Sequence, residues 1–192
     1  MTNLKYDRQD AIEKATDLFW AKGFHATSMR NIQQAIDMRP GSIYACFGSK
    51  EGLFKDTLHH YAQMSRQRLQ ECVAASSSPL EGLKRFVRDA VTGCNISAPS
   101  GMCMLAKTIS ELSSDNAELL LEAKQLLQSV EAALAALLRE AQVQGEVSRL
   151  KTPESMARYL QVQLMGLRVY SSANKDQQQI EILIEDVFDS LR

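Results

Sequence analysis

The chain has few of the residues that interrupt helices, form cross-links or bind metals. Only 4 Pro and 9 Gly occur among its 192 residues, which leaves few sites for the tight turns that join short strands. Its four cysteines show no CxxC or Cys/His metal spacing, so we expect free thiols and no metal site. They are Cys46, Cys72, Cys94 and Cys103.

Long apolar segments are also lacking. No run approaches the roughly 18–20 apolar residues that a membrane-spanning helix needs. Residues 1–8 are polar and lack the apolar stretch of a secretory signal. With hydrophobic content at 45% and charged content at 23%, we expect a folded, cytoplasmic protein.

The residues needed for catalysis are sparse. The three histidines, His25, His59 and His60, all lie in the N-terminal third. The sequence contains no phosphate-binding loop, HExxH or Gly-x-Ser-x-Gly motif. We therefore predict that the protein is not an enzyme and needs no cofactor.

The charge is nearly balanced overall but uneven along the chain. The net charge of −1 and the pI of about 6.3 exclude a generally basic nucleic-acid binder. Residues 1–68 carry ten Lys/Arg against seven Asp/Glu, whereas the remainder carries twelve against sixteen. A local positive patch near the N-terminus is thus compatible with the composition.

The apolar residues follow helical spacing throughout, which predicts an all-α fold of about nine helices. Ser76-Ser-Ser-Pro79 is the clearest internal boundary, since a Pro in the first helical position follows a small polar break. The expected helices cover about 7–22, 29–36, 40–47, 50–73, 79–94, 101–112, 115–144, 153–173 and 176–191.

Residues 27–53 carry the functional signal. Two short helices joined by a four-residue break, after a first helix, are typical of a helix-turn-helix, whose second helix can lie in the DNA major groove. The expected N-termini at Thr27-Ser28 and Ser49-Lys50 would direct backbone N–H groups and a lysine toward phosphates.

Residues 7–58 resemble the N-terminal domain of the TetR family of transcriptional regulators. The most specific part is the run Gly41-Ser-Ile-Tyr44, Phe47 and Ser49-Lys-Glu-Gly-Leu53. Further matching residues precede it: Ala15, Leu18, Phe19, Gly23, Phe24, Thr27, Ser28, Ile32 and Ala35.

The resemblance implies a homodimer that binds a palindromic operator and leaves it when a small molecule enters the C-terminal domain. It implies a three-helix helix-turn-helix domain over 1–53, with a linking helix to about 75. Residues 76–192 would form a helical effector-binding and dimerisation domain. A ligand-responsive regulator, most often a repressor, is the predicted function.

Three residues depart from the family pattern. Asp37 replaces the usual Gly in the turn, although Asp tolerates a left-handed conformation better than most residues. Arg39 replaces the Ser or Thr that commonly caps the recognition helix, and is a poor cap but a candidate base or phosphate contact. Cys46 replaces a His or Tyr before the Phe, where some members contact phosphate.

The predicted DNA-binding residues lie on the helix-turn-helix and at the start of the next helix, whereas Ile43, Phe47 and Leu53 are expected in the core. Those predicted to contact DNA are Thr27, Ser28, Arg39, Pro40, Gly41, Ser42, Tyr44, Ala45 and Lys50.

The C-terminal part offers candidates for an effector pocket. Such pockets are mostly apolar with a few orienting polar groups. The candidate lining residues are Phe86, Met102, Cys103, Met104, Tyr159, Met165 and Tyr170. Because a thiol near a helix N-terminus can be reactive, an oxidant or electrophile acting at Cys103 is one alternative to an apolar effector. Pairing of Cys94 with Cys103, oxidation of Cys46, and an inert buried thiol remain open.

The last two expected helices are apolar on more than one face, so the second face must be buried against something. A two-fold interface between copies would do this. Its predicted residues are Leu160, Leu164, Leu167, Ile180, Ile184, Val187 and Phe188. An alternative function is a helical adaptor dimer whose DNA-binding module is degenerate, for which Asp37 and Cys46 are the best support.

Overall fold

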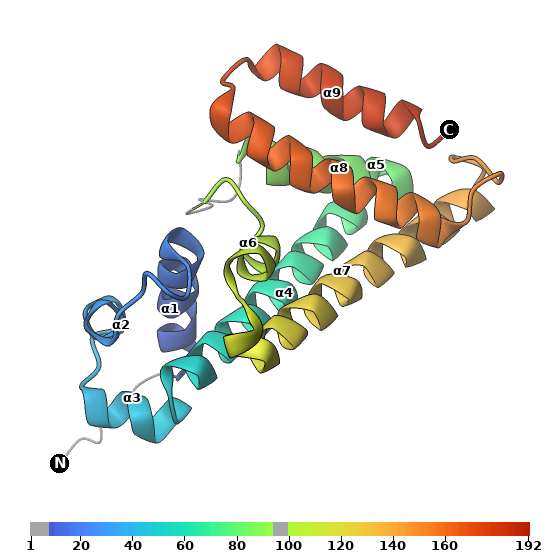
Figure 1. Ribbon diagram of the computed structural model, residues 1–192. Coiled ribbons are helices and arrows are strands. Elements are labelled where there is room, and N and C mark those ends of the chain that lie inside the picture. Colours follow the sequence, from blue (N-terminus) through green and yellow to red (C-terminus); the bar gives the residue numbers. More distant parts are fainter. Residues whose placement is uncertain (1–7, 94–99) are drawn as a thin grey trace. The chain divides into compact units, whose positions relative to one another are not determined.

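The computed structural model describes residues 8–93 and 100–192, and across these ranges the chain is helical with no strand (Figure 1). This confirms the all-α prediction. The helices are α1 (Arg8–Lys22), α2 (Met29–Ile36), α3 (Pro40–Phe47), α4 (Lys50–Ala74), α5 (Pro79–Thr92), α6 (Met104–Glu111), the 3₁₀ helix η1 (Ser114–Asn116), α7 (Ala117–Val143), α8 (Pro153–Ala173) and α9 (Gln177–Asp189).

The bounds differ from the sequence expectation mainly around α6. This helix begins at Met104 rather than at Gly101, and a 3₁₀ turn separates it from α7. In that turn Ser113 Oγ accepts a hydrogen bond from the backbone N–H of Asp115 at 3.4 Å. A three-residue 3₁₀ turn is too short for hydrophobic periodicity to reveal.

Two compact units divide the chain. Unit 1 consists of the described residues up to Gln63 together with Met104–Leu126, and unit 2 consists of the described residues of Met64–Cys103 together with Leu127–Arg192. The long helices α4 and α7 therefore each contribute residues to both units.

The core of unit 1 is rich in aromatic side chains. The rings of Phe19 and Phe24 both pack against Phe54, with centroids 4.8 and 5.0 Å away, and Trp20 lies edge-on to Tyr61 at 5.0 Å. All five are at most 5% exposed. Because aromatic side chains bury large apolar areas, this cluster joins α1, the turn after it and α4 into one body.

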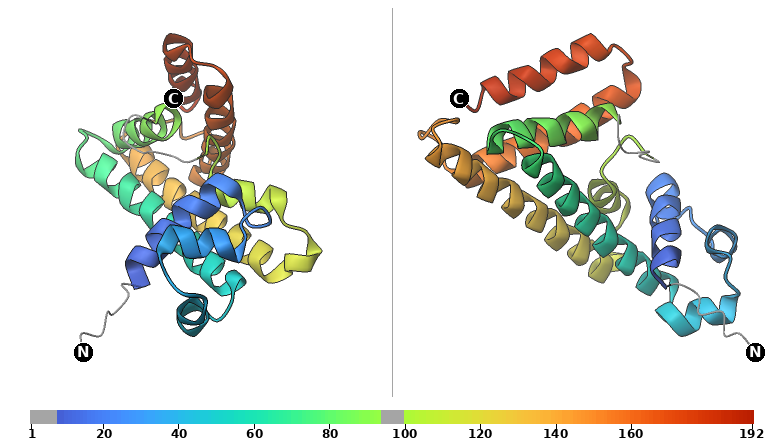
Figure 2. Two further views of the ribbon diagram at one scale, coloured as in Figure 1. Left: turned by 90° about the vertical axis from the view of Figure 1, so that its left-hand side faces the viewer. Right: turned by 180° about the vertical axis from the view of Figure 1, so that it is seen from behind.

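The core of unit 2 is mostly aliphatic. Helices α5, α8 and α9 pack on one another, and α8 and α9 lie side by side in opposite directions (Figures 1 and 2). Helix α5 approaches α4 closely at Gly82, where an added Cβ would lie 2.6 Å from the Cα of Val73. Ion pairs from Arg88 to Glu181 and Glu185 join α5 to α9 at the surface.

Candidate DNA-binding site

The turn between α2 and α3 is formed by residues that each satisfy a local requirement. Ser28 begins α2 with a capping box, in which its Oγ accepts from Asn31 N at 3.2 Å and its own N–H donates to Asn31 Oδ1 at 3.1 Å. Asp37 ends the helix in the left-handed conformation, with φ 52° and ψ 43°. The expectation that Asp37 permits this turn is confirmed, and the next residue, Met38, is buried.

Helix α3 presents one exposed face and one buried face. Arg39 precedes the helix in an extended conformation and makes no side-chain cap hydrogen bond, as predicted, and Pro40 occupies the first helical position. Ile43 and Phe47 are buried in unit 1. The exposed side consists of Arg39, Pro40, Gly41, Tyr44, Ala45 and Cys46, with Ser42 half-buried at its edge.

Helix α4 begins beside this face. Ser49 Oγ accepts from the backbone N–H of Gly52 at 3.1 Å, which caps the first turn. The ammonium group of Lys50 lies 4.2 Å from the centre of the Phe24 ring. Partial burial lowers the pKa of Lys50, while the nearby carboxylates of Glu51 and Glu111 act in the opposite direction.

Thr27 does not belong to this surface. Its side chain is fully buried and its Oγ1 donates to the carbonyl oxygen of Gly23 at 2.6 Å, so its hydroxyl stabilises the turn after α1. The prediction of a DNA contact from Thr27 is corrected accordingly. The prediction rested on an expected helix N-terminus at Thr27-Ser28, but Ser28 alone caps α2, and a Thr hydroxyl is readily satisfied by a carbonyl four residues earlier.

Several site features were not predicted from the sequence. The guanidinium of Arg8 lies 5.2 Å from the Phe47 ring centre and donates to Asp56 at 2.6 Å. Glu111 on α6 accepts hydrogen bonds from the turn after α1. These partners are 39 to 87 positions apart in the chain, and no local pattern signals such pairs.

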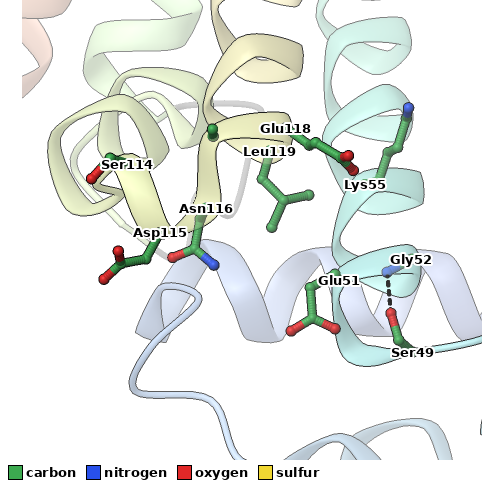
Figure 3. Close-up of a pocket in the computed structure, with 10 residues that line it drawn as sticks. Ser49, Glu51, Gly52, Lys55, Ser114, Asp115, Asn116, Glu118 and Leu119 are labelled. Carbon is green, nitrogen blue, oxygen red and sulfur yellow. Dashed lines mark hydrogen bonds between the residues drawn. The ribbon is translucent and has the colours of Figure 1, made fainter.

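A pocket of about 490 Å³ lies in unit 1 between the first turns of α4 and residues 114–119 (Figure 3). Asp115 and Glu118 line one side and Glu51 the other, whereas Lys55 is already paired with Glu122 at 2.7 Å. The lining is thus more acidic than basic, which is the opposite of a phosphate-binding surface. None of the residues predicted to line an effector pocket contributes to it.

The predicted effector residues occupy different environments. Phe86 and Met104 are buried, Met102, Cys103 and Met165 are half-buried, and Tyr159 and Tyr170 are exposed. Met104 belongs to unit 1 and the other six to unit 2. Two buried polar side chains of α8 that were not predicted, Gln161 and Arg168, lie two turns apart on one face of that helix.

The seven residues predicted at a dimer interface are buried within the chain itself, at 0–7% exposure. They form part of the core of unit 2, where they contact α5 and one another. The apolar side chains that α8 and α9 leave exposed are different ones: Tyr159, Val162, Val169, Tyr170 and Ile182. The periodicity predicts that both helices are apolar on more than one face, but it does not identify which face the chain itself covers.

The described cysteines also differ. Cys46 is exposed on α3, Cys103 is half-buried directly before α6, and Cys72 is buried. Burial raises the pKa of the Cys72 thiol, which reduces its thiolate fraction and hence its reactivity. Cys94, and with it the suggested Cys94–Cys103 pair, lies outside the described residues.

Residues 8–93 and 100–192 contain no group of three or more His, Cys, Asp or Glu side chains that could hold a metal ion. Over the same ranges, no helix combines the length and apolar content that a membrane crossing needs.

Two protein-family models match the chain. Residues 11–57 match bacterial regulatory proteins of the tetR family, and residues 79–187 match the tetracyclin repressor-like C-terminal domain. Together the two matches include the helix-turn-helix and most of unit 2.

Individual proteins are similar to the chain as well. The transcriptional repressor ComR of Escherichia coli K12 is 26% identical over 166 residues, which cover 85% of this chain and 79% of ComR. The repressor BdcR of the same strain is 29% identical over 105 residues, about half of each protein. A cysteine mutant of the TetR-family regulator CifR, solved with a 26-bp double-stranded operator DNA, has the same fold with a TM-score of 0.86, 22% identity and full coverage of both chains.

Proposed function

The chain belongs to the tetR family of bacterial regulatory proteins, which regulate transcription and are not enzymes, and from this membership we propose how it acts. It represses transcription by binding a palindromic operator as a homodimer, and it leaves the operator when a small molecule binds unit 2. Residues 1–53 with the linking helix serve DNA binding, and residues 76–192 serve effector binding and dimerisation.

The observation that carries this proposal is the exposed side of α3 beside the N-terminus of α4. A helix in the major groove reads sequence through side chains at base edges, and contacts to phosphates fix its position. Arg39 is exposed at the start of α3 and makes no side-chain cap hydrogen bond, and a guanidinium can donate two hydrogen bonds to a guanine edge. The absence of a side chain at Gly41 allows close approach of the backbone, and Ala45 fits against a thymine methyl group.

Phosphate contacts surround these base-reading residues. Tyr44 is about half exposed, so its hydroxyl is available to a phosphate oxygen. Lys50 and the backbone N–H groups of the first turn of α4 favour an anion in the same place. The backbone N–H groups of the first turn of α2, which follows Ser28, supply a further phosphate contact.

The exposed apolar side chains of α8 and α9 support the homodimer. Val162, Val169 and Ile182 are 47–60% exposed. Covering these apolar side chains with a second copy of the chain removes them from water, which stabilises the dimer. A homodimer that binds half-sites one helical turn apart holds its two α3 helices in successive major grooves, about 34–36 Å apart. An effector that prefers a different spacing releases the DNA by shifting the population of conformers.

The effector site is proposed within unit 2, near Gln161 and Arg168. Small-molecule sites combine an apolar lining with a few polar groups that orient the ligand, and these two polar side chains are buried among aliphatic ones. An oxidant or electrophile that modifies Cys103 is the alternative signal.

Operator binding tests the DNA-binding part of the proposal. We would measure fluorescence anisotropy of the purified protein with labelled DNA from upstream of its own gene, at about 50 and 200 mM salt. Lys50→Ala and Tyr44→Ala are each expected to weaken binding, and Lys50→Ala also to reduce the salt dependence by about one unit of log–log slope. Lys175→Ala, which removes the same charge from an exposed position of unit 2, is the matched control and is expected to change little.

The outcomes separate the proposed repressor from the adaptor. An equal loss of operator affinity in Lys175→Ala and Lys50→Ala would contradict a specific role of α4 in DNA binding. Absence of binding to this promoter and to random DNA at low salt would favour an adaptor with a degenerate module. For the dimer, Val162→Asp is expected to yield monomers in analytical ultracentrifugation, whereas Val143→Asp, at the exposed end of α7, is expected to leave the dimer intact.

A further inference from the structure

Helix α6 caps the end of α1 with a lysine. Lys107 Nζ donates to the carbonyl oxygens of Trp20 at 3.0 Å and Ala21 at 2.7 Å. The last carbonyl groups of a helix have no partner within it, and a cation there also interacts favourably with the helix dipole. Lys107 therefore fixes the C-terminal end of α1 against α6.

One turn further along α6, Glu111 binds the backbone that follows α1. Its carboxylate accepts from the N–H of Phe24 at 3.1 Å and from the N–H of His25 at 2.6 Å. Gly23 adopts φ +87°, and a Cβ at this position would lie 2.4 Å from Glu111 Oε2. The carboxylate is thus in direct contact with a turn that only glycine can form without strain.

Phe24 connects this turn to the DNA-binding surface. Its backbone N–H is held by Glu111, while its ring packs on Phe54 with centroids 5.0 Å apart. The ammonium group of Lys50 lies over the same ring, 4.2 Å from its centre. A cation at this distance over an aromatic face is attracted to it, so the position of Lys50 depends on the position of Phe24.

We propose that Glu111 is a positioning residue for operator binding, because it holds Phe24 where that ring directs Lys50 toward a phosphate. The inference rests on the proposed phosphate contact of Lys50. The proposal predicts the direction of the change in operator affinity when Glu111 is substituted. Glu111 is an acid close to a surface that binds a polyanion, so removal of its charge alone would strengthen DNA binding, whereas loss of positioning weakens it.

The experiment compares two acids of unit 1 in the full-length protein by operator-binding anisotropy. Glu111→Gln keeps one carbonyl oxygen, so it cannot serve both N–H groups as the carboxylate does. We expect its operator affinity to fall roughly five- to tenfold, within the usual range of coupling between contacting residues. The control is Glu118→Gln, an exposed position that loses the same charge and is expected to bind equally or more tightly.

A double-mutant cycle shows whether the effect passes through Lys50. Lys50→Met alone tests the phosphate contact. In the Lys50→Met background, Glu111→Gln is expected to have an effect of less than about twofold. The salt slope of Glu111→Gln is expected to approach that of Lys50→Met, about 0.9 units shallower than that of the wild type. A purely structural role for Glu111 would leave this slope unchanged.

Trp20 fluorescence and circular dichroism establish that each variant is folded at the assay temperature. If Glu111→Gln loses helix content, Glu111→Asp replaces it, since this variant keeps the charge and withdraws the carboxylate by one methylene. Tighter operator binding by the Glu111 variants would overturn the inference. So would a loss of operator affinity from Glu111→Gln that is as large in the Lys50→Met background as in the wild type. If Lys50→Met itself binds normally, the proposed phosphate contact fails as well, which distinguishes the two failures.

Discussion

The two units satisfy their buried polar groups in different ways. In unit 1 the buried polar side chains are four threonines, Thr16, Thr27, Thr57 and Thr108. Each donates its hydroxyl to a backbone carbonyl three or four residues earlier, at 2.6–2.9 Å. These hydrogen bonds form as soon as the local backbone forms, and they need no distant partner.

In unit 2 the buried polar side chains are larger and depend on other elements. Asp89 on α5 accepts from Arg68 on α4 at 2.6 Å, and Arg168 on α8 donates to the carbonyl oxygen of Met102 at 3.4 Å. The Oε1 atom of Gln161 is buried without a hydrogen-bond partner among the described residues. Because buried polar groups are costly unless they are paired, unit 2 has contacts that a ligand could complete or replace. The four threonine hydroxyls of unit 1 are already satisfied, and the exception in that unit is Asn116, whose Oδ1 is buried without a hydrogen-bond partner among the described residues.

The largest expected effect concerns the aromatic core that accompanies the local hydrogen bonds of unit 1. Phe54→Ala is expected to lower the free energy of unfolding by about 3–5 kcal/mol, since Phe54 is 1% exposed and the cavity would adjoin Phe19 and Phe24. Urea denaturation followed by Trp20 fluorescence reports unit 1 directly, because Trp20 is the single tryptophan. Tyr44→Ala, on the surface of the same unit, is the control and should change stability by less than about 0.5 kcal/mol.

The ion pair in unit 2 should have the next largest effect. Asp89→Asn keeps the shape of the side chain but removes the charge that pairs with Arg68, and we expect a loss of about 1–3 kcal/mol. Circular dichroism during urea denaturation measures this loss. Glu71→Gln removes a longer, exposed contact of the same arginine at 3.4 Å, so an equal effect of both variants would show that burial of Asp89 contributes nothing.

At Gln161 a substitution is expected to stabilise the protein rather than destabilise it. Gln161→Met retains the approximate volume and removes the unpaired acceptor, so a gain of about 1 kcal/mol in the free energy of unfolding is expected. Gln163→Met, at a half-buried position of the same helix, is not fully matched in burial, but it controls for the change in helix composition. Destabilisation by Gln161→Met would mean that the amide contributes a contact of its own, and would weaken the contrast between the units.

A surface contact of unit 1 has a smaller, pH-dependent effect. Hydrogen bonding from Lys55, with a further contribution from His59, lowers the pKa of Glu122. A lowered pKa in the folded state stabilises the protein above the unfolded pKa of about 4.3, and this contribution is lost as pH falls through the folded value. Glu122→Gln should therefore cost about 0.5–1 kcal/mol at pH 7 and nothing once both forms are protonated. A difference that persists at pH 2 would contradict this assignment.

The smallest expected effect is a direct test of local satisfaction. Thr16→Val is expected to cost less than about 1 kcal/mol, because the carbonyl of Ile12 keeps its position within the helix and the substitution preserves the side-chain shape. Thermal unfolding measures the change. A loss as large as that of Asp89→Asn would show that both units depend equally on their buried polar groups.

Much of the fold follows from the sequence because local rules determine it. Pro40 at the start of α3, Ser78 before α5 and Thr152 before α8 begin their helices as expected. Asp37 and Arg39 behave as their side-chain chemistry predicts. These features depend on residues within four positions of one another, so the local sequence is enough to predict them.

The remaining features depend on residues distant in the chain. Periodicity identified Leu164 and Ile184 as apolar and predicted them at an interface between copies, whereas the chain itself buries them. The burial of Thr27 and its hydrogen bond to Gly23 were not predicted. No residue near Lys107 or Glu111 in the sequence indicates a partner 86 or 87 positions away.

The contribution of α6 to unit 1 has a consequence for protein engineering. A designer who exchanges helix-turn-helix segments between family members would cut the chain near residue 75, where the sequence shows a boundary. Such a transplant leaves Lys107 and Glu111 behind, so the host must supply an acid and a base, one helical turn apart, for the foreign α1. A chimaera that carries residues 104–126 along with the N-terminal segment keeps the module whole, and is the exchange expected to retain the donor's operator preference.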